Sequence, residues 1–182
     1  MSSTGSAVNG FTFFELLFVV ALCAVIATIG VPAFNSIAAK ARLRRSAETI
    51  AADLRLAHHL SVTSQIPVYV SFSTAGQCYS ISSVPDCPCD SPQAACLQRS
   101  PLQRHARIID SEQLGGVQIT EARFGPASGT QFTPPRGTAR FGHVVLTDHG
   151  KFQLQLRLSL PGRVRVCNPD SANTLFLDYP PC

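Results

Sequence analysis

Two arginines near the end of the chain have a spacing that suits an anionic polymer. Arg163 and Arg165 follow Gly162 of a Pro-Gly turn and alternate with two valines. In a β-strand, alternate side chains point to the same face about 7 Å apart, which is close to the phosphate spacing along a nucleic-acid strand. The pattern therefore predicts a strand that buries its valines and presents to solvent two guanidinium groups, which suit phosphate binding.

A second interpretation of the same strand involves no ligand. Strands at the edge of a sheet often carry charged residues that discourage pairing with another chain, and an exposed Arg-x-Arg strand fits this role equally well. The positive patch could also be larger than two residues. Strand alternation puts Arg157 on the solvent face of the preceding predicted strand and Lys151 at its start, and we expect both to extend the patch.

The chain contains no recognisable catalytic or metal-binding spacing. His58 and His59 are adjacent and so point about 100° apart on a helix, which prevents them from sharing a metal ion. His105, His143 and His149 are isolated in the sequence. The motifs of serine hydrolases, zinc peptidases and P-loop proteins are missing. We therefore expect no enzymatic activity, no cofactor and no metal site.

Composition limits the possible classes of protein. The 182 residues are 45% apolar and 14% charged, with a formal net charge of +4. This is too apolar for an intrinsically disordered chain and unlike the composition of collagen, a coiled-coil rod or a protein with many membrane spans. The length predicts one ordinary domain with an appendage, and the mild positive charge is compatible with a nucleic-acid partner without requiring one.

The elements that must position the arginines form an α+β arrangement. Residues 11–34 are apolar with Glu15 as their only charge, a length that can span a bilayer. Residues 35–64 continue as an amphipathic helix. Its apolar seam consists of Leu43, Ala47, Ile50, Leu54 and Ala57, and the charged residues off the seam are Arg42, Arg45, Glu48 and Asp53. The later pattern has period two, which predicts that residues 65–182 form an antiparallel β head packed on the long helix.

The start of the chain resembles the class III signal of type IV prepilins and pseudopilins. The pattern is G-F-T-F-F-E at residues 10–15, with a glycine before the apolar run and a lone carboxylate within it. The resemblance implies that a prepilin peptidase removes residues 1–10 by cutting between Gly10 and Phe11, and that it methylates the new amino terminus. It also implies that Glu15 faces the amino group of a neighbouring subunit. A plain single-span anchor with a tolerated glutamate is the alternative.

The resemblance also implies a location. The chain would cross the bacterial inner membrane once, with its head in the periplasm, and would later join other pilin subunits in a pilus at the cell surface. Four basic residues just after the apolar run argue for the opposite orientation by the positive-inside rule: Lys40, Arg42, Arg44 and Arg45. We keep the prepilin orientation because the cysteines after the apolar run fit an oxidising compartment.

Three further stretches resemble the GspH/FimT group of pseudopilins. They are A-H-H-L-S-V-T-S-Q-I-P-V at residues 57–68, G-T-A-R-F at 137–141 and G-R-V-R-V-C at 162–167. Minor pilins of the FimT type, which bind DNA during natural transformation, carry a G-R-x-R motif that Gly162, Arg163 and Arg165 match. The resemblance implies DNA binding at these residues. Such binding would be dominated by phosphates and hence insensitive to base sequence. There are two alternatives: a GspH-type pseudopilin of type II secretion, and a minor pilin that acts only in pilus assembly.

The cysteines predict disulfides in the head. Cys23 lies in the apolar run, and the six others are Cys78, Cys87, Cys89, Cys96, Cys167 and Cys182. An even number in an oxidising compartment favours disulfides, although six cysteines allow many pairings. We expect Cys167 to pair with Cys182, and Cys78–Cys87 and Cys89–Cys96 to staple residues 77–100, an irregular insertion rich in Cys, Pro, Ser and Gln. A zinc site made of the four clustered cysteines is the alternative.

Overall fold

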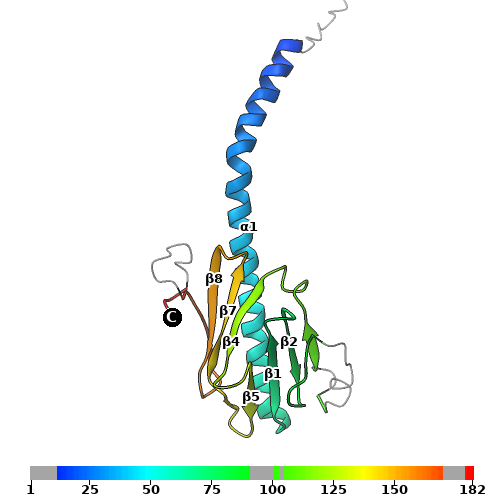
Figure 1. The fold of residues 1–182 in the computed structure, drawn as a ribbon, viewed down its shortest axis with the longest axis vertical. Helices are drawn as coiled ribbons and strands as arrows, with labels where there is room; N and C mark the ends of the chain where they lie inside the picture. Colours follow the sequence, from blue (N-terminus) through cyan, green and yellow to red (C-terminus); the bar gives the residue numbers. More distant parts are fainter. Residues whose placement is uncertain (1–11, 91–100, 103–104, 170–178) are drawn as a thin grey trace, which may run out of the picture. The chain divides into compact units, whose positions relative to one another are not determined.

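The computed structural model describes residues 12–90, 101–102, 105–169 and 179–182, and of residues 29–33 it describes the backbone alone. One helix precedes nine strands in this part of the chain (Figure 1): α1 (Phe13–Ser64), β1 (Val68–Ser73), β2 (Cys78–Ser82), β3 (Arg107–Ile109), β4 (Gln118–Arg123), β5 (Gly129–Thr133), β6 (Thr138–Ala139), β7 (Gly142–Asp148), β8 (Phe152–Leu158) and β9 (Val164–Cys167). The chain divides into two compact units, Met1–Ala38 and Ala39–Cys182.

The first unit contains the beginning of α1. Thr12 precedes the helix, and its hydroxyl oxygen accepts a hydrogen bond from the Glu15 backbone N–H at 3.3 Å. A threonine cap with a glutamate three residues later is the pattern of a capping box, so Glu15 also belongs to the start signal of the helix. The side chains from Phe13 to Thr28 are all exposed, and Phe13 and Phe14 are 77% and 78% exposed.

The predicted membrane span is only partly covered by the described residues. Within the described part of the chain, no helix is long and apolar enough to cross a membrane. The leader 1–10, the cleavage site at Gly10 and Phe11, and the side chains of residues 29–33 lie outside the description. The span at residues 11–34 therefore stays a prediction.

The second unit begins with the rest of α1, which has the predicted apolar seam. The five seam residues from Leu43 to Ala57 are at most 1% exposed. Asp53, which lies off the seam, is nevertheless buried, with 5% of its surface exposed. It accepts a hydrogen bond from the Tyr79 hydroxyl at 2.7 Å and forms an ion pair with Arg107. A buried charge with two such partners avoids much of the penalty of leaving water.

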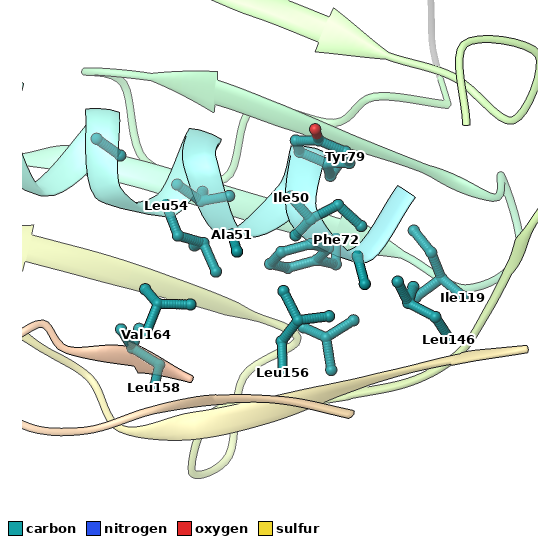
Figure 2. Close-up of a cluster of buried hydrophobic side chains, with 14 of the residues drawn as sticks. Ile50, Ala51, Leu54, Phe72, Tyr79, Ile119, Leu146, Leu156, Leu158 and Val164 are labelled. Carbon is teal, nitrogen blue, oxygen red and sulfur yellow. The ribbon is translucent and has the colours of Figure 1, made fainter. Parts of the chain in front are cut away.

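Two antiparallel sheets pack against this half of the helix. The five-stranded sheet has the order β3-β2-β1-β5-β6, and the four-stranded sheet has the order β4-β7-β8-β9. Side chains from α1 and from both sheets meet in one core, as Figure 2 shows for Ile50, Leu54, Phe72, Tyr79, Leu156 and Val164. The α+β fold that we predicted, a long helix packed on an antiparallel β head, is confirmed.

Residues 78–82 correct the prediction of an irregular insertion at 77–100. They form β2, which pairs with β1 on one side and with β3 on the other, and all five are buried. In this strand Tyr79 and Ile81 alternate with cysteine and serine, which are small enough to be buried here but carry no apolar signal. Residues 91–100 lie outside the description.

The disulfides agree with the prediction at the tail and differ from it in the cysteine-rich segment. Cys167 pairs with Cys182, with 5.1 Å between their Cα atoms. Cys78 pairs with Cys89, and Cys87 is also disulfide-bonded, so the predicted Cys78–Cys87 and Cys89–Cys96 pairs are wrong. The chain reverses after β2 so that the Cys87 carbonyl accepts a hydrogen bond from Ser80 Oγ at 2.6 Å. These sulfurs are oxidised and cannot supply the thiolates that a zinc site needs.

Candidate functional site

The predicted arginine strand has the expected alternation. Val164 and Val166 of β9 are buried, at 7% and 8% exposed, whereas Arg165 and Arg163, which directly precedes the strand, are exposed. Arg157 of β8 is also exposed, and it lies directly opposite Arg165 in the β8–β9 register. The structure therefore brings Arg157, Arg163 and Arg165 together on the solvent face of the four-stranded sheet.

This arrangement places like charges side by side. The side chains of directly opposed residues begin about 5 Å apart, and like charges in such pairs are destabilising. Arg157 Nη1 donates a hydrogen bond to the Cys182 carbonyl oxygen at 2.6 Å. No carboxylate among the described residues forms an ion pair with Arg163 or Arg165. Within the described residues, the charges of Arg163 and Arg165 are therefore not offset by an ion pair.

The edge-strand interpretation accounts for only part of the cluster. β9 lies at the edge of the four-stranded sheet, as that interpretation requires for Arg163 and Arg165. Arg157 belongs to β8, which is paired with β7 on one side and β9 on the other. A charge on an inner strand cannot protect an edge, and Arg157 instead donates a hydrogen bond to Cys182 of the tail.

The three arginines line a groove of about 690 Å³, which we call the arginine groove. Phe141 and Leu160 also line it, and they are 64% and 61% exposed. Its wall includes residues 180–182, which the Cys167–Cys182 disulfide holds against the end of β9. Backbone hydrogen bonds from Asn168 N to Pro180 O at 2.9 Å and from Cys182 N to Asn168 O at 3.0 Å fix the same segment.

Gly162, which we predicted as part of the DNA-binding motif, lies in the turn before the arginines, and its role in binding stays a prediction. It is buried, has φ +79°, and a Cβ at this position would lie 2.4 Å from His58 Cδ2 on α1. Its N–H donates to the Ser159 carbonyl at 2.9 Å in the turn between β8 and β9. Only glycine suits both the left-handed backbone and the close approach of the histidine.

His58 contacts a second glycine turn as well. A Cβ at Gly137, where φ is +65°, would lie 2.5 Å from His58 Nε2, and the His58 ring packs edge-on against Phe132 with 5.8 Å between centroids. Gly137 begins the G-T-A-R-F stretch that ends at Phe141. One helix side chain therefore positions the turn before the arginines and the turn before the exposed phenylalanine.

Lys151 is not part of the arginine groove. It directly precedes β8, whereas Arg157 lies near the other end of that strand, about 20 Å away along the strand at 3.4 Å per residue. The predicted extension of the patch to Lys151 is therefore not formed. The patch extends instead across the sheet, towards residues that the sequence did not indicate.

Arg123 and His143 continue the basic row across the four-stranded sheet. The register pairs Arg123 of β4 with His143 of β7, and His143 with Arg157 of β8. These three residues and Phe141 line a second cleft of about 340 Å³ beside the arginine groove. The Glu121 carboxylate lies 3.2 Å from Arg123 Nη2 and 3.4 Å from His143 Nε2, so this end of the row is partly neutralised.

Two comparisons with known proteins agree with this fold. The model of the family described as type II transport protein GspH matches residues 46–176. The chain is also similar to the crystal structure of the type IV minor pilin FimU from Pseudomonas aeruginosa (strain PAO1), with a TM-score of 0.50 and 17% sequence identity over 74% of this chain and 92% of that one. At this identity the likeness concerns the fold alone. No curated protein sequence matches the chain.

Proposed function

Because the chain belongs to the GspH family and has the type IV pilin fold, we propose that it is a minor type IV pilin whose head binds DNA during natural transformation. The observation that carries the proposal is the opposed pair Arg157 and Arg165, with Arg163 beside them. Their mutual repulsion is offset when a polyanion binds. Phosphate groups suit guanidinium donors, and contacts to phosphates do not depend on base sequence.

The first part of α1 has the exposed apolar surface that a membrane or filament helix needs. The side chains from Phe13 to Thr28 are all exposed, which a helix in water does not tolerate over this length. We propose that a prepilin peptidase cuts between Gly10 and Phe11 and that residues 11–34 then lie in the bacterial inner membrane. In the pilus, neighbouring subunits would cover the same surface, with Glu15 near a neighbour's amino terminus.

The test measures DNA binding by the full chain in a neutral detergent. Fluorescence anisotropy with a labelled duplex, repeated over a series of salt concentrations, gives the affinity and its salt slope. If Arg163 and Arg165 each neutralise one phosphate, changing both to Gln should reduce the slope by about 1.8, from about 0.9 per contact. Affinity for unrelated duplexes should fall alike.

Lys151→Gln provides the matched control for Arg165→Gln. Each substitution removes one exposed positive charge, but Lys151 lies outside the arginine groove. Arg165→Gln should lower the salt slope by about 0.9, whereas Lys151→Gln should leave it unchanged. Equal effects of the two substitutions, or parent-like binding by the double variant, would contradict the proposed site.

A role in pilus assembly or in type II secretion is the second candidate. The matching family is described as a type II transport protein, which favours this alternative directly. The groove arginines would then bind acidic groups on a neighbouring subunit. In that case the parent binds no DNA even at low salt, where electrostatic attraction is strongest, and the Arg163 and Arg165 double variant fails to enter filaments.

A further inference from the structure

An exposed aromatic ring lies in the middle of the basic surface. Phe141 is 64% exposed and lines both the arginine groove and the cleft beside it. It directly precedes β7, and strand alternation puts it on the same face as His143, the solvent face that also carries Arg157. A phenylalanine of this exposure contributes little to the core, and its ring is accessible to a ligand at this position.

The basic residues form a row that crosses the sheet beside this ring. The register aligns Arg123, His143, Arg157 and Arg165 on four successive strands. Three strand spacings of about 4.8 Å separate the first from the last, or about 14 Å in total. Because the two clefts share Phe141 and Arg157, the ring and the row belong to one continuous surface.

A ring beside a row of basic side chains suits a strand whose bases are free. In a duplex, the base faces are stacked inside the helix, so a phenylalanine on the protein surface reaches them only by unstacking a base step, which costs free energy. In a single strand, each base has an accessible face, and stacking on an aromatic side chain strengthens binding of any base. A positively charged groove that follows the backbone, combined with an aromatic platform, is the usual design of such sites.

We propose that the arginine groove takes single-stranded DNA, with one base stacked on Phe141 and the neighbouring phosphates bound by Arg157, Arg163 and Arg165. This rests on the proposed DNA-binding function and assigns its substrate class. The weaker, partly neutralised end of the row at Arg123 then carries the next part of the strand. Leu160, the other exposed apolar residue of the groove, has no π face and borders the site without stacking.

The test compares two matched ligands on the full chain in detergent. One is a labelled single-stranded thymidine oligonucleotide, and the other is a duplex that carries the same number of phosphates. Phe141→Leu keeps an apolar side chain of similar reach but removes the ring. It should weaken single-strand binding about 5- to 150-fold, the range expected for one stacked base, and leave duplex binding within about twofold. Phe141→Tyr should bind like the parent.

The salt dependence of single-strand binding separates the contribution of the arginine charges from that of the Phe141 ring. Phe141→Leu removes no charge and should leave the salt slope for the single strand unchanged. Arg165→Gln should reduce that slope by about 0.7, the value per phosphate of a single strand. Leu160→Ala is the control for a general loss of apolar surface, and it should change single-strand affinity less than Phe141→Leu does.

The outcomes distinguish this inference from the function on which it rests. If the parent binds neither ligand, the proposed DNA-binding function fails. If the parent binds DNA but Phe141→Leu has no effect, or weakens both ligands equally, DNA binding stands and the stacking site is wrong. If the groove instead binds an acidic peptide, Phe141→Leu is tolerated and the parent has no affinity for the thymidine oligonucleotide.

Discussion

Gly162→Ala tests whether the turn before the arginines is determined by His58. The substitution puts a Cβ 2.4 Å from His58 Cδ2 and 3.0 Å from the Gly137 carbonyl oxygen, at a residue with φ +79°. The left-handed backbone costs an alanine about 1–2 kcal/mol. Crowding in a packed region costs typically about 1–3 kcal/mol more. We therefore expect Gly162→Ala to lower the free energy of unfolding by about 2–5 kcal/mol.

Gly116→Ala separates the two contributions. Gly116 has φ +78°, but no atom lies within 4 Å of the Cβ position. This control should therefore lose only the conformational part, about 1–2 kcal/mol. Urea unfolding followed by circular dichroism measures both variants. Adding His58→Ala to each glycine variant completes a double-mutant cycle, and only Gly162 should show a coupling energy with His58.

Two results would refute this reasoning. If Gly162→Ala is no more destabilising than Gly116→Ala, then His58 does not restrict the turn. If Gly162→Ala retains full stability but loses DNA binding, then Gly162 contacts the ligand itself, contrary to its burial.

Two further predictions concern Tyr79 and Glu15. Tyr79→Phe should lower the free energy of unfolding by about 1.5–3 kcal/mol at neutral pH, because it removes a hydrogen bond to the Asp53 carboxylate. Burial, and then this hydrogen bond, raise the pKa of Tyr79 above its ordinary value of 10.0, so the unfolded chain loses the hydroxyl proton first. Parental stability should fall above pH 10 by up to about 1.4 kcal/mol per pH unit, and urea unfolding of Tyr79→Phe should lack this contribution. Glu15→Gln should retain the capping box with Thr12 but fail to enter filaments if the carboxylate charge is the assembly contact; filament incorporation at the parental level would assign Glu15 to the helix cap alone.

Local sequence patterns predicted the features that depend on a single helix or a single strand. The alternation of Val164 and Val166 with Arg165 follows from strand periodicity, and the seam from Leu43 to Ala57 follows from helix periodicity. Asp53 shows the limit of this approach, because a carboxylate is expected to face solvent unless its partners are known. Those partners come from β2 and β3, which are distant in the sequence.

The candidate site was harder to predict, because it depends on how the strands pair. G-R-x-R indicated Arg163 and Arg165, but no local pattern shows that Arg123 and His143 lie in one row with Arg157. That row requires the register of four strands. The prediction for Lys151 failed for a different reason: Lys151 directly precedes β8, whereas Arg157 lies near the other end of that strand.

The close contact of Gly162 with His58 could not be predicted from the sequence either. The two residues are far apart along the chain, and a glycine after proline is explained well enough by a turn. Likewise, the spacing of the cysteines could not indicate that Cys78 pairs with Cys89, because the loop after β2 determines which sulfurs meet.

The Cys167–Cys182 disulfide also determines when in the life of the chain the groove is complete. Thiols stay reduced in the cytosol, so a newly made chain has no bond to hold residues 180–182 against β9. In the proposed location, an oxidising periplasm, the bond closes and the groove acquires its wall. A protein that binds phosphates without sequence preference would otherwise compete for the chromosome of the cell that makes it. For the proposed DNA-binding function, oxidation after export would postpone full binding until the chromosome is on the other side of a membrane.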